Sequence, residues 1–280
     1  MLRRWYPQLR RILPVGLRHL IRYPLSGLRS HWHDLRFSGL GPVTLRVRPD
    51  WVVRCHPATV RAFSAHMIER TFKDELAQFV GTCTPGMTLI DVGAHYGVFT
   101  LAALHYGGPD ARVIAIDPSP RAQRYLAVNL ALNAAESRVR CLGQALSDTP
   151  RTIDMLTTGP GQAHMMIRPA EGRSDSVGVA ATTLDEIAVG AGRPITHVKI
   201  DVEGYEGHVL RGGAALLRDQ RPIIALELHN DLLRQLGDDP RDLVANLERA
   251  GYWCRGDDGH PVPWAPLTIP HIARITAVAS

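Results

Sequence analysis

The spacing of apolar and polar residues changes along the chain and predicts a main domain of alternating strands and helices. From Met87 onward, short apolar runs alternate with segments whose apolar residues recur at helical spacing. The predicted strands are 88–92, 112–116, 139–146, 197–202, 223–228, 252–255 and 272–278, and the predicted helices are 98–106, 120–132, 183–188, 207–217 and 240–250. This alternation is typical of an α/β fold with a parallel sheet covered by helices on both faces.

The part of the chain before this alternation has a different pattern. Residues 42–54 alternate between apolar and polar side chains, which predicts a β-hairpin. Residues 58–80 carry apolar positions at helical spacing, which predicts one helix. Residues 84–86 then interrupt the pattern with a proline and a glycine, which are typical of turns. We therefore expect two domains: an arm, hairpin and helix over 1–83, and the α/β domain over 84–280.

A second hairpin is expected inside the α/β domain, from strands at 153–156 and 177–181. The residues between them, 157–176, include Gly159-Pro160-Gly161 and Gly172, so no regular structure is expected there. Loops at the carboxyl edge of such a sheet commonly carry substrate contacts on a rigid scaffold. One hypothesis is that this loop selects the substrate and closes over it. The alternative is a surface loop without a ligand.

Positive charge is concentrated at the N-terminus. Residues 1–61 hold 12 arginines and two acids, a net charge of +10, whereas the rest of the chain carries −5. Nucleic-acid binding requires basic residues clustered on the working domain, so it is not expected of the body. Residues 1–40 are expected to form short helices with arginine on their polar face. They either contact a membrane surface or an acidic partner, or pack on the body as an ordinary flank.

The composition is that of a soluble globular protein, with 45% apolar and 21% charged residues. No run of 18 apolar residues is present, so no transmembrane helix is expected. The apolar run near the N-terminus is short and interrupted, which disfavours a cleavable signal. The four cysteines form no C-x-x-C pair, which argues against a zinc ribbon or a disulfide framework. We therefore expect free thiols and a cytoplasmic protein.

A glycine turn and two acids are the strongest indication of a ligand. Asp91, Gly93 and Gly97 lie between a predicted strand and helix, and Asp117 ends the next strand. The glycines let the backbone turn sharply and approach a ligand. A dinucleotide site would have G-x-G-x-x-G, and Asp91 would repel a pyrophosphate but suits a cationic amino-acid group. An acid at position 117 can accept both ribose hydroxyls. These features together favour S-adenosylmethionine over a plain turn with a surface aspartate.

Polar residues also end two later strands. Asp201 and Glu203 share one face at the end of one strand, and Glu227 and His229 do so at the next. Ligands bind at this edge in open α/β sheets. Two close carboxylates can hold a metal or supply a general base, and histidine is suited to proton abstraction near neutral pH. The structural alternative is that Lys199 pairs with one acid while the other caps the following helix.

These motifs resemble, in order, the FkbM family of S-adenosylmethionine-dependent methyltransferases over roughly residues 54–255. The matching segments are 88–97, 116–120, Asn129, Asn133, 145–148, 183–185, 199–206 and 222–229, with 54–57 and 75–76 upstream. The run Lys-Ile-Asp-Val-Glu-Gly at 199–204 is the most specific of them. The resemblance implies a class I methyltransferase (Rossmann-like) fold: a seven-stranded, mostly parallel sheet with helices on both faces, here with an N-terminal extension. It also implies O-methylation of a hydroxyl on a sugar, glycan or natural product.

The resemblance also implies roles for individual residues. The residues expected to bind S-adenosylmethionine are Asp91, Gly93, Ala94, His95, Tyr96, Gly97, Asp117, Pro118 and Ala145. Asp117 stands where the family more often has glutamate, and His95-Tyr96 stands where Asn-Ile or a similar pair is frequent. Catalysis is expected of Asp201, His229 and Glu203, with Asp201 or His229 as the base. If a divalent metal takes part, Asp201 and Glu203 are its expected ligands.

The expected acceptor is a small hydroxylated molecule, and two other functions stay open. One is an RNA or protein methyltransferase whose arginine-rich arm binds an acidic partner. No stacking surface of aromatic and basic residues, of the kind that single-stranded RNA requires, is apparent in the sequence. The other is a scaffold that keeps the fold without the cofactor, and the intact Asp91, Gly93, Gly97 and Asp117 argue against it.

Overall fold

The computed structural model describes residues 37, 39–157, 165–167, 176–256, 259–262, 267 and 272–280. Most of the N-terminal arm and most of the loop 157–176 lie outside these ranges, so the hypotheses about their roles stay predictions. Within the described ranges, no helix has both the length and the apolar character needed to cross a membrane. All four cysteines are free thiols, as predicted.

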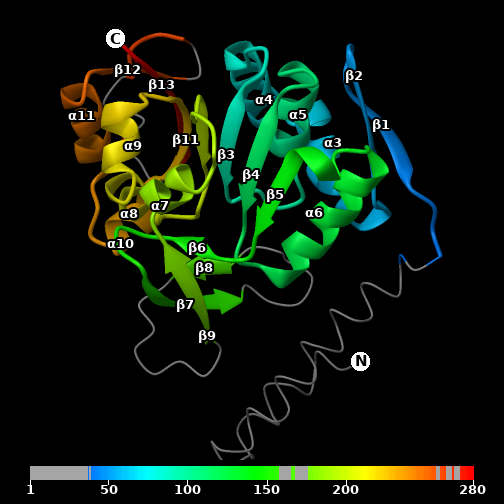
Figure 1. Cartoon of the computed structure of the whole chain (residues 1–280), viewed down its shortest axis with the longest axis horizontal. Coiled ribbons are helices and arrows are strands. Elements are labelled where there is room, and N and C mark those ends of the chain that lie inside the picture. The colour runs from blue at the N-terminus through cyan, green and yellow to red at the C-terminus, as the bar shows by residue number, and fades with distance from the viewer. Residues whose placement is uncertain are drawn as a thin grey trace, which may run out of the picture.

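A seven-stranded sheet forms the centre of the protein (Figure 1). Its strands are β3 (Thr88–Val92), β4 (Arg112–Ile116), β5 (Val139–Leu142), β10 (His197–Ile200), β11 (Ile223–His229), β12 (Tyr252–Arg255) and β13 (Ile272–Ala279). Their order is β12-β13-β11-β10-β3-β4-β5. The pairs from β11 to β5 are parallel, and β13 runs antiparallel to both β11 and β12. This sheet confirms the predicted α/β fold class.

Helices cover both faces of the sheet. One face carries α5 (Val98–Tyr106) and α6 (Pro120–Leu132), and the other carries α7 (Leu184–Val189), α8 (Glu206–Arg211), α9 (Ala214–Asp219), α10 (Asn230–Gln235) and α11 (Pro240–Arg249). Successive strand residues point to opposite faces, so Leu89 of β3 packs in one hydrophobic cluster while Ile90 and Val92 pack in the other. The two clusters form the core and leave the strand ends at the sheet edge for polar groups.

The N-terminal part adds a hairpin and two helices to the α5–α6 face. Its elements are β1 (Val43–Arg48), β2 (Trp51–Cys55), the 3-10 helix η2 (Pro57–Thr59), α3 (Val60–Ile68) and α4 (Arg70–Thr82). The prediction of one helix over 58–80 is wrong, because Glu69 has extended backbone and separates α3 from α4. Phe63 and Leu76 belong to the same hydrophobic cluster as Leu89. One core therefore includes both parts of the chain, and the domain boundary after residue 83 stays a prediction.

A second, four-stranded sheet lies beside the carboxyl edge of the first (Figure 1). Its strands, in the order β6-β9-β7-β8, are β6 (Ala145–Leu146), β9 (Ser176–Thr182), β7 (Arg151–Thr157) and β8 (Met165–Ile167). The predicted strand 139–146 is therefore wrong, because the chain leaves the first sheet after Leu142 and joins the second at Ala145. The loop 157–176 also contains regular structure, since β8 pairs with β7 and so satisfies backbone groups that a loop would leave unpaired.

The predicted helix over 207–217 is likewise two helices, α8 and α9, separated by Gly212 and Gly213. A Cβ on Gly212 would lie 2.1 Å from the carbonyl oxygen of Ser147. The break therefore lets the chain after β6 approach the α8–α9 junction closely. Contacts of this kind join residues far apart in the sequence, which is why helical spacing alone did not reveal the break.

Candidate active site

The turn after β3 is shaped by contacts with both neighbouring strands. The amides of Gly93 and Ala94 donate to the carbonyl of Ile116 at 2.9 and 3.0 Å. Gly93 has φ +85, and a Cβ there would lie 1.9 Å from the carbonyl oxygen of Asp201. Glycine is therefore required at this position because the chain after β10 passes directly against it. The sequence had indicated a sharp turn and close approach to a ligand, but not this contact with the chain after β10.

Four of the predicted cofactor residues, Asp91, Ala94, Tyr96 and Gly97, are buried behind the turn. Asp91 is 1% exposed; its Oδ2 accepts a hydrogen bond from the Thr100 hydroxyl at 2.6 Å, and its Oδ1 has no hydrogen-bond partner. Burial raises the pKa of Asp91. Gly97, with φ +88, is the N-cap of α5. These residues support the turn from within, and the contact of Asp91 with a cationic group stays a prediction.

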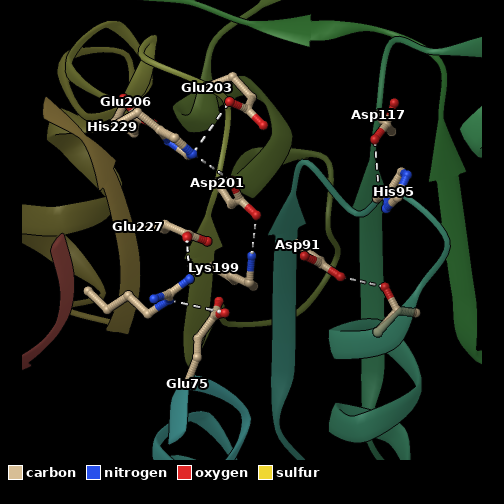
Figure 2. A network of polar contacts seen from close by, with 12 residues as sticks. Glu75, Asp91, His95, Asp117, Lys199, Asp201, Glu203, Glu206, Glu227 and His229 are labelled. Carbon is tan, nitrogen blue, oxygen red and sulfur yellow. Dashed lines mark hydrogen bonds and ion pairs between the residues drawn. The ribbon is translucent and has the colours of Figure 1, made fainter. Parts of the chain in front are cut away.

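The Asp117 carboxylate, just after β4, is held by backbone amides (Figure 2). Its Oδ2 accepts a hydrogen bond from the His95 amide at 2.9 Å, and its Oδ1 accepts one from the Ser119 amide at 2.8 Å. Burial raises the pKa of Asp117 to about 7, although these two hydrogen bonds act in the opposite direction. The structure thus brings the glycine turn and Asp117 together.

At the ends of β10 and β11, charged side chains contact one another (Figure 2). His229 Nε2 lies 3.9 Å from Asp201 Oδ1 and 3.5 Å from Glu203 Oε2. Lys199 Nζ donates a hydrogen bond to Asp201 Oδ2 at 3.2 Å. Because β10 and β11 are adjacent and parallel, residues that end each strand meet at one edge. Asp201 therefore lies between Lys199 and His229.

The His229 ring faces carboxylates on both sides. Its Nδ1 lies 2.8 Å from Oε1 of Glu206, whose side chain is fully buried, and its Nε2 faces Asp201 and Glu203. Burial alone lowers the pKa of His229, but the hydrogen bond to Glu206 and the three nearby carboxylates raise it to about 9. Each ring nitrogen therefore faces a carboxylate, an arrangement that favours the protonated imidazolium. An imidazolium cannot accept a further proton, which disfavours His229 as the general base.

Below this edge, a buried network of charges joins α4 to the sheet (Figure 2). Arg274 Nη2 donates to Glu227 Oε1 at 2.7 Å, and Arg274 Nε lies 3.2 Å from Glu75 Oε2. Burial raises the pKa of Glu227 to about 8 and also raises the pKa of Glu75. Glu227, which the sequence placed beside His229, therefore pairs with Arg274 in the network between α4 and β13.

One pocket at the carboxyl edge joins the β4 end to the β10 end. Its lining residues are Val92, Gly93, His95, Ile116, Asp117, Pro118, Gln144, Ala145, Leu146, Met155, Asp201, Val202, Glu203 and Tyr205. The predicted residues in this lining are Gly93, His95, Asp117, Pro118, Ala145, Asp201 and Glu203; those outside it are Asp91, Ala94, Tyr96, Gly97 and His229. Among the described residues, the lining contains three carboxylates and neither lysine nor arginine. The pocket is therefore acidic.

Three polar or large pocket residues, Gln144, Met155 and Tyr205, were not predicted. Gln144 follows β5, so the rule that ligands bind at strand ends would have identified it. Tyr205 lies two residues after Glu203, inside the 199–206 segment already recognised, but was not assigned to the site. Met155 belongs to β7 in the second sheet, and no spacing in the sequence places that strand at this edge. Only the tertiary structure reveals its contribution.

The described residues contain no group of three or more His, Cys, Asp or Glu side chains arranged to hold a metal. Asp201 and Glu203, the expected ligands of a divalent metal, lie beside the charged side chains of Lys199 and His229 instead. Their role as metal ligands stays a prediction.

The sheet order, the helices on both faces and the pocket at the carboxyl edge define a class I methyltransferase fold. Residues 91–254 match the family described as the methyltransferase FkbM domain. This match covers more than half of the chain, which therefore belongs to the FkbM methyltransferase family. The resemblance seen in the motifs is confirmed.

Several solved structures are similar to this chain at low sequence identity. The FkbM methyltransferase from Methylobacillus flagellatus KT is 16% identical with a TM-score of 0.47, over 79% of this chain and 55% of that one. This chain therefore spans about half the length of that protein. The precorrin-6y C5,15-methyltransferase from Geobacter metallireducens GS-15 is 13% identical with a TM-score of 0.44, over 76% and 90% of the two chains. A SAM-dependent methyltransferase from Aquifex aeolicus is 13% identical with a TM-score of 0.45, over 80% and 98%. No curated protein is significantly similar to this chain.

Proposed function

We propose that this FkbM-family protein uses S-adenosylmethionine to methylate a hydroxyl group on a sugar, glycan or natural product. The observation that carries the proposal is that the carboxylates of Asp117, Asp201 and Glu203 line one pocket, whose lining among the described residues contains neither lysine nor arginine. A cleft lined by charges of one sign attracts ligands of the opposite sign. Such a pocket favours a cationic cofactor and disfavours nucleotides that carry phosphates.

The pocket residues fit the groups of this cofactor. S-adenosylmethionine, when bound, supplies a methyl group that is already electrophilic. Each Asp117 oxygen accepts one amide hydrogen bond and keeps a further lone pair, so the carboxylate can also accept the two ribose hydroxyls. Gly93, His95, Pro118 and Ala145 provide the adjoining wall.

We assign removal of the acceptor's hydroxyl proton to Asp201. This carboxylate lines the pocket, and Lys199 and His229 hold it from two sides. His229 is unsuited to the same task because the carboxylates around it favour its protonated form. Positioning an acceptor oxygen beside an electrophilic methyl group accelerates transfer by itself, so a weak base is sufficient.

The acceptor is proposed to be a small molecule. Met155 supports this, because β7 both lines the pocket and leads into the loop that we expect to select the acceptor. A nucleic-acid acceptor is not proposed, since the acidic pocket would repel a phosphate backbone. Contact of residues 1–40 with a membrane surface or an acidic partner stays a prediction.

Calorimetry on the purified protein tests the cofactor. We expect S-adenosylmethionine to bind and ATP, which carries the same adenosine with three phosphates, to bind far more weakly. The acceptor can then be sought by incubating the protein and cofactor with a panel of hydroxylated sugars and natural products. A product heavier by one methyl group in place of a hydrogen, detected by mass spectrometry, is the expected result. A folded protein that binds ATP and not S-adenosylmethionine would contradict the proposal.

A further inference from the structure

Glu206 carries a carboxylate that neither lines the pocket nor contacts solvent. It is the first residue of α8, and its side chain is fully buried. Its Oε1 accepts hydrogen bonds from the Gly204 amide at 3.0 Å and from His229 Nδ1 at 2.8 Å. Its Oε2 is buried without a hydrogen-bond partner. A buried carboxylate is costly to maintain, so these two contacts require an explanation.

The first contact holds a strained turn. Glu203 has φ +55, in the left-handed region that side chains other than glycine rarely adopt. Gly204 has φ +99, and a Cβ on it would lie 2.4 Å from the Cβ of Leu232. Strained backbone of this kind persists only where the surrounding structure holds it. The hydrogen bond from the Gly204 amide to Glu206 is a restraint directly after the strained residue, and it directs the Glu203 side chain toward the pocket.

The second contact sets the orientation of His229. With Nδ1 held by Glu206, the opposite nitrogen is directed at Glu203 and Asp201. The titratable groups that face the ring are therefore Glu206 from α8 and Asp201 and Glu203 from the chain that follows β10. Loss of this second contact would free the ring to rotate away from both pocket carboxylates.

We propose that Glu206 is a positioning residue that uses one oxygen to hold both the Glu203 turn and the His229 ring, and so fixes the acidic end of the pocket. His229 then connects Glu206 to Glu203 and Asp201. The inference rests on the proposed function, because the geometry matters for catalysis only if this edge receives the acceptor. It extends that function to a residue that contacts neither the pocket nor the reacting groups.

Two variants separate the charge of Glu206 from its hydrogen bonds. Glu206→Gln keeps an oxygen that can accept from the Gly204 amide and from His229 Nδ1 but removes the negative charge beside His229, whereas Glu206→Ala removes the charge and both hydrogen bonds. Glu186→Gln is a matched control, because Glu186 also lies in the first turn of a helix and accepts a backbone amide, yet it is exposed and does not line the pocket. All three are compared with the full-length parent protein.

The first measurement needs no acceptor. In ¹⁵N NMR spectra, the ring signals of His229, assigned from their loss in His229→Gln, should show a hydrogen-bonded Nδ1 proton in the parent protein. We expect this signal to shift or exchange faster in Glu206→Gln and to stay unchanged in Glu186→Gln. Unchanged His229 signals in a folded Glu206→Gln protein would overturn the proposal. If Glu206→Ala does not fold, the spectrum of Glu206→Gln still tests the proposal.

The second measurement uses the hydroxylated acceptor found by the mass screen. We expect Glu206→Gln to lower kcat by about 10- to 100-fold, the usual range when a group that orients a functional side chain is removed. The affinity for S-adenosylmethionine, measured by calorimetry, should stay within about twofold because the Asp117 end is untouched. Parent-like kcat in Glu206→Gln would overturn the inference. Failure of the proposed function would look different, because the parent protein itself would then bind no S-adenosylmethionine.

Discussion

The two ends of the pocket both carry carboxylates, but they hold them differently. At the β4 end, Asp117 accepts hydrogen bonds from two backbone amides. At the β10–β11 end, Asp201 and Glu203 contact the charged side chains of Lys199 and His229. Backbone donors keep their protons and survive most substitutions, whereas side-chain charges can be removed one at a time. We therefore expect the geometry of the β4 end to tolerate most substitutions of its neighbours. The geometry of the β10–β11 end should depend on each of its charged partners.

Gly93 connects the two ends, so replacing it should have the largest effect. A Cβ at this position meets the Asp201 carbonyl oxygen at 1.9 Å and also meets a positive φ. We expect Gly93→Ala to lower the free energy of unfolding by about 3–5 kcal/mol, as overpacking and backbone strain add together. Urea unfolding, monitored by circular dichroism, measures this change in the free energy of unfolding.

Gly108→Ala is the matched control for that experiment. Gly108 has φ +77, but no atom lies within 4 Å of a Cβ placed there. Its replacement should therefore lower the free energy of unfolding only through backbone strain, by about 1–2 kcal/mol. Equal losses in the two variants would show that the contact between Gly93 and Asp201 is unimportant.

The β10–β11 end should control turnover. We expect Asp201→Asn to lower kcat by about 100-fold or more, the range for a general base, with a smaller change in cofactor affinity. Steady-state kinetics on the acceptor found by mass spectrometry provides the measurement. Asp154→Asn, at an exposed site on β7 outside the pocket, serves as the control. A kcat of Asp201→Asn close to that of the parent protein would contradict the role of Asp201 as general base. Alignment of the acceptor would then account for catalysis alone.

The β4 end should control cofactor affinity. Asp117→Ala removes a charged acceptor of the ribose hydroxyls, so we expect S-adenosylmethionine to bind about 1–3 kcal/mol more weakly. Calorimetry at pH 8, with circular dichroism to verify folding, measures the difference. Unchanged affinity in a folded variant would place the ribose elsewhere.

The pKa of Asp117 makes this affinity depend on pH. Burial raises that pKa to about 7, so the free carboxyl group is neutral below that pH and ionised above it. Ribose hydroxyls donate to the ionised form, and binding must therefore release a proton at low pH. We expect affinity to fall by up to about tenfold for each pH unit below 7 and to level off above it. Asp117→Asn should abolish this slope.

The smallest effect is expected from a chelator. Lys199 and His229 lie beside Asp201, and His229 also lies beside Glu203, where a divalent cation would have to bind. These contacts already engage both carboxylates, so a metal would first have to displace Lys199 and His229 from them. We expect EDTA to leave turnover within about twofold of its untreated value. Activity lost with EDTA and restored by a divalent metal would show that the metal displaces these contacts.

The sequence predicted the positions of most strands and helices and the edge that carries the pocket. The glycine turn, Asp117 and the 199–204 motif all lie at strand ends that the apolar runs already marked. The errors occur where distant parts of the chain meet. Glu69 interrupts a helical pattern, Gly212 lies against Ser147, and the strand expected over 139–146 divides between two sheets. Local spacing contains no information about such contacts.

The sequence by itself determined the fold class and the family, because both depend on local periodicity and short motifs. It did not determine which acids face the pocket. Asp91 and Asp117 were both predicted to contact the cofactor, yet one is buried behind the turn and the other lines the cavity. Nor did it reveal that Glu206 and two further carboxylates raise the pKa of His229. The tertiary structure decided both, because burial and electrostatic interactions depend on which groups folding brings within a few ångströms.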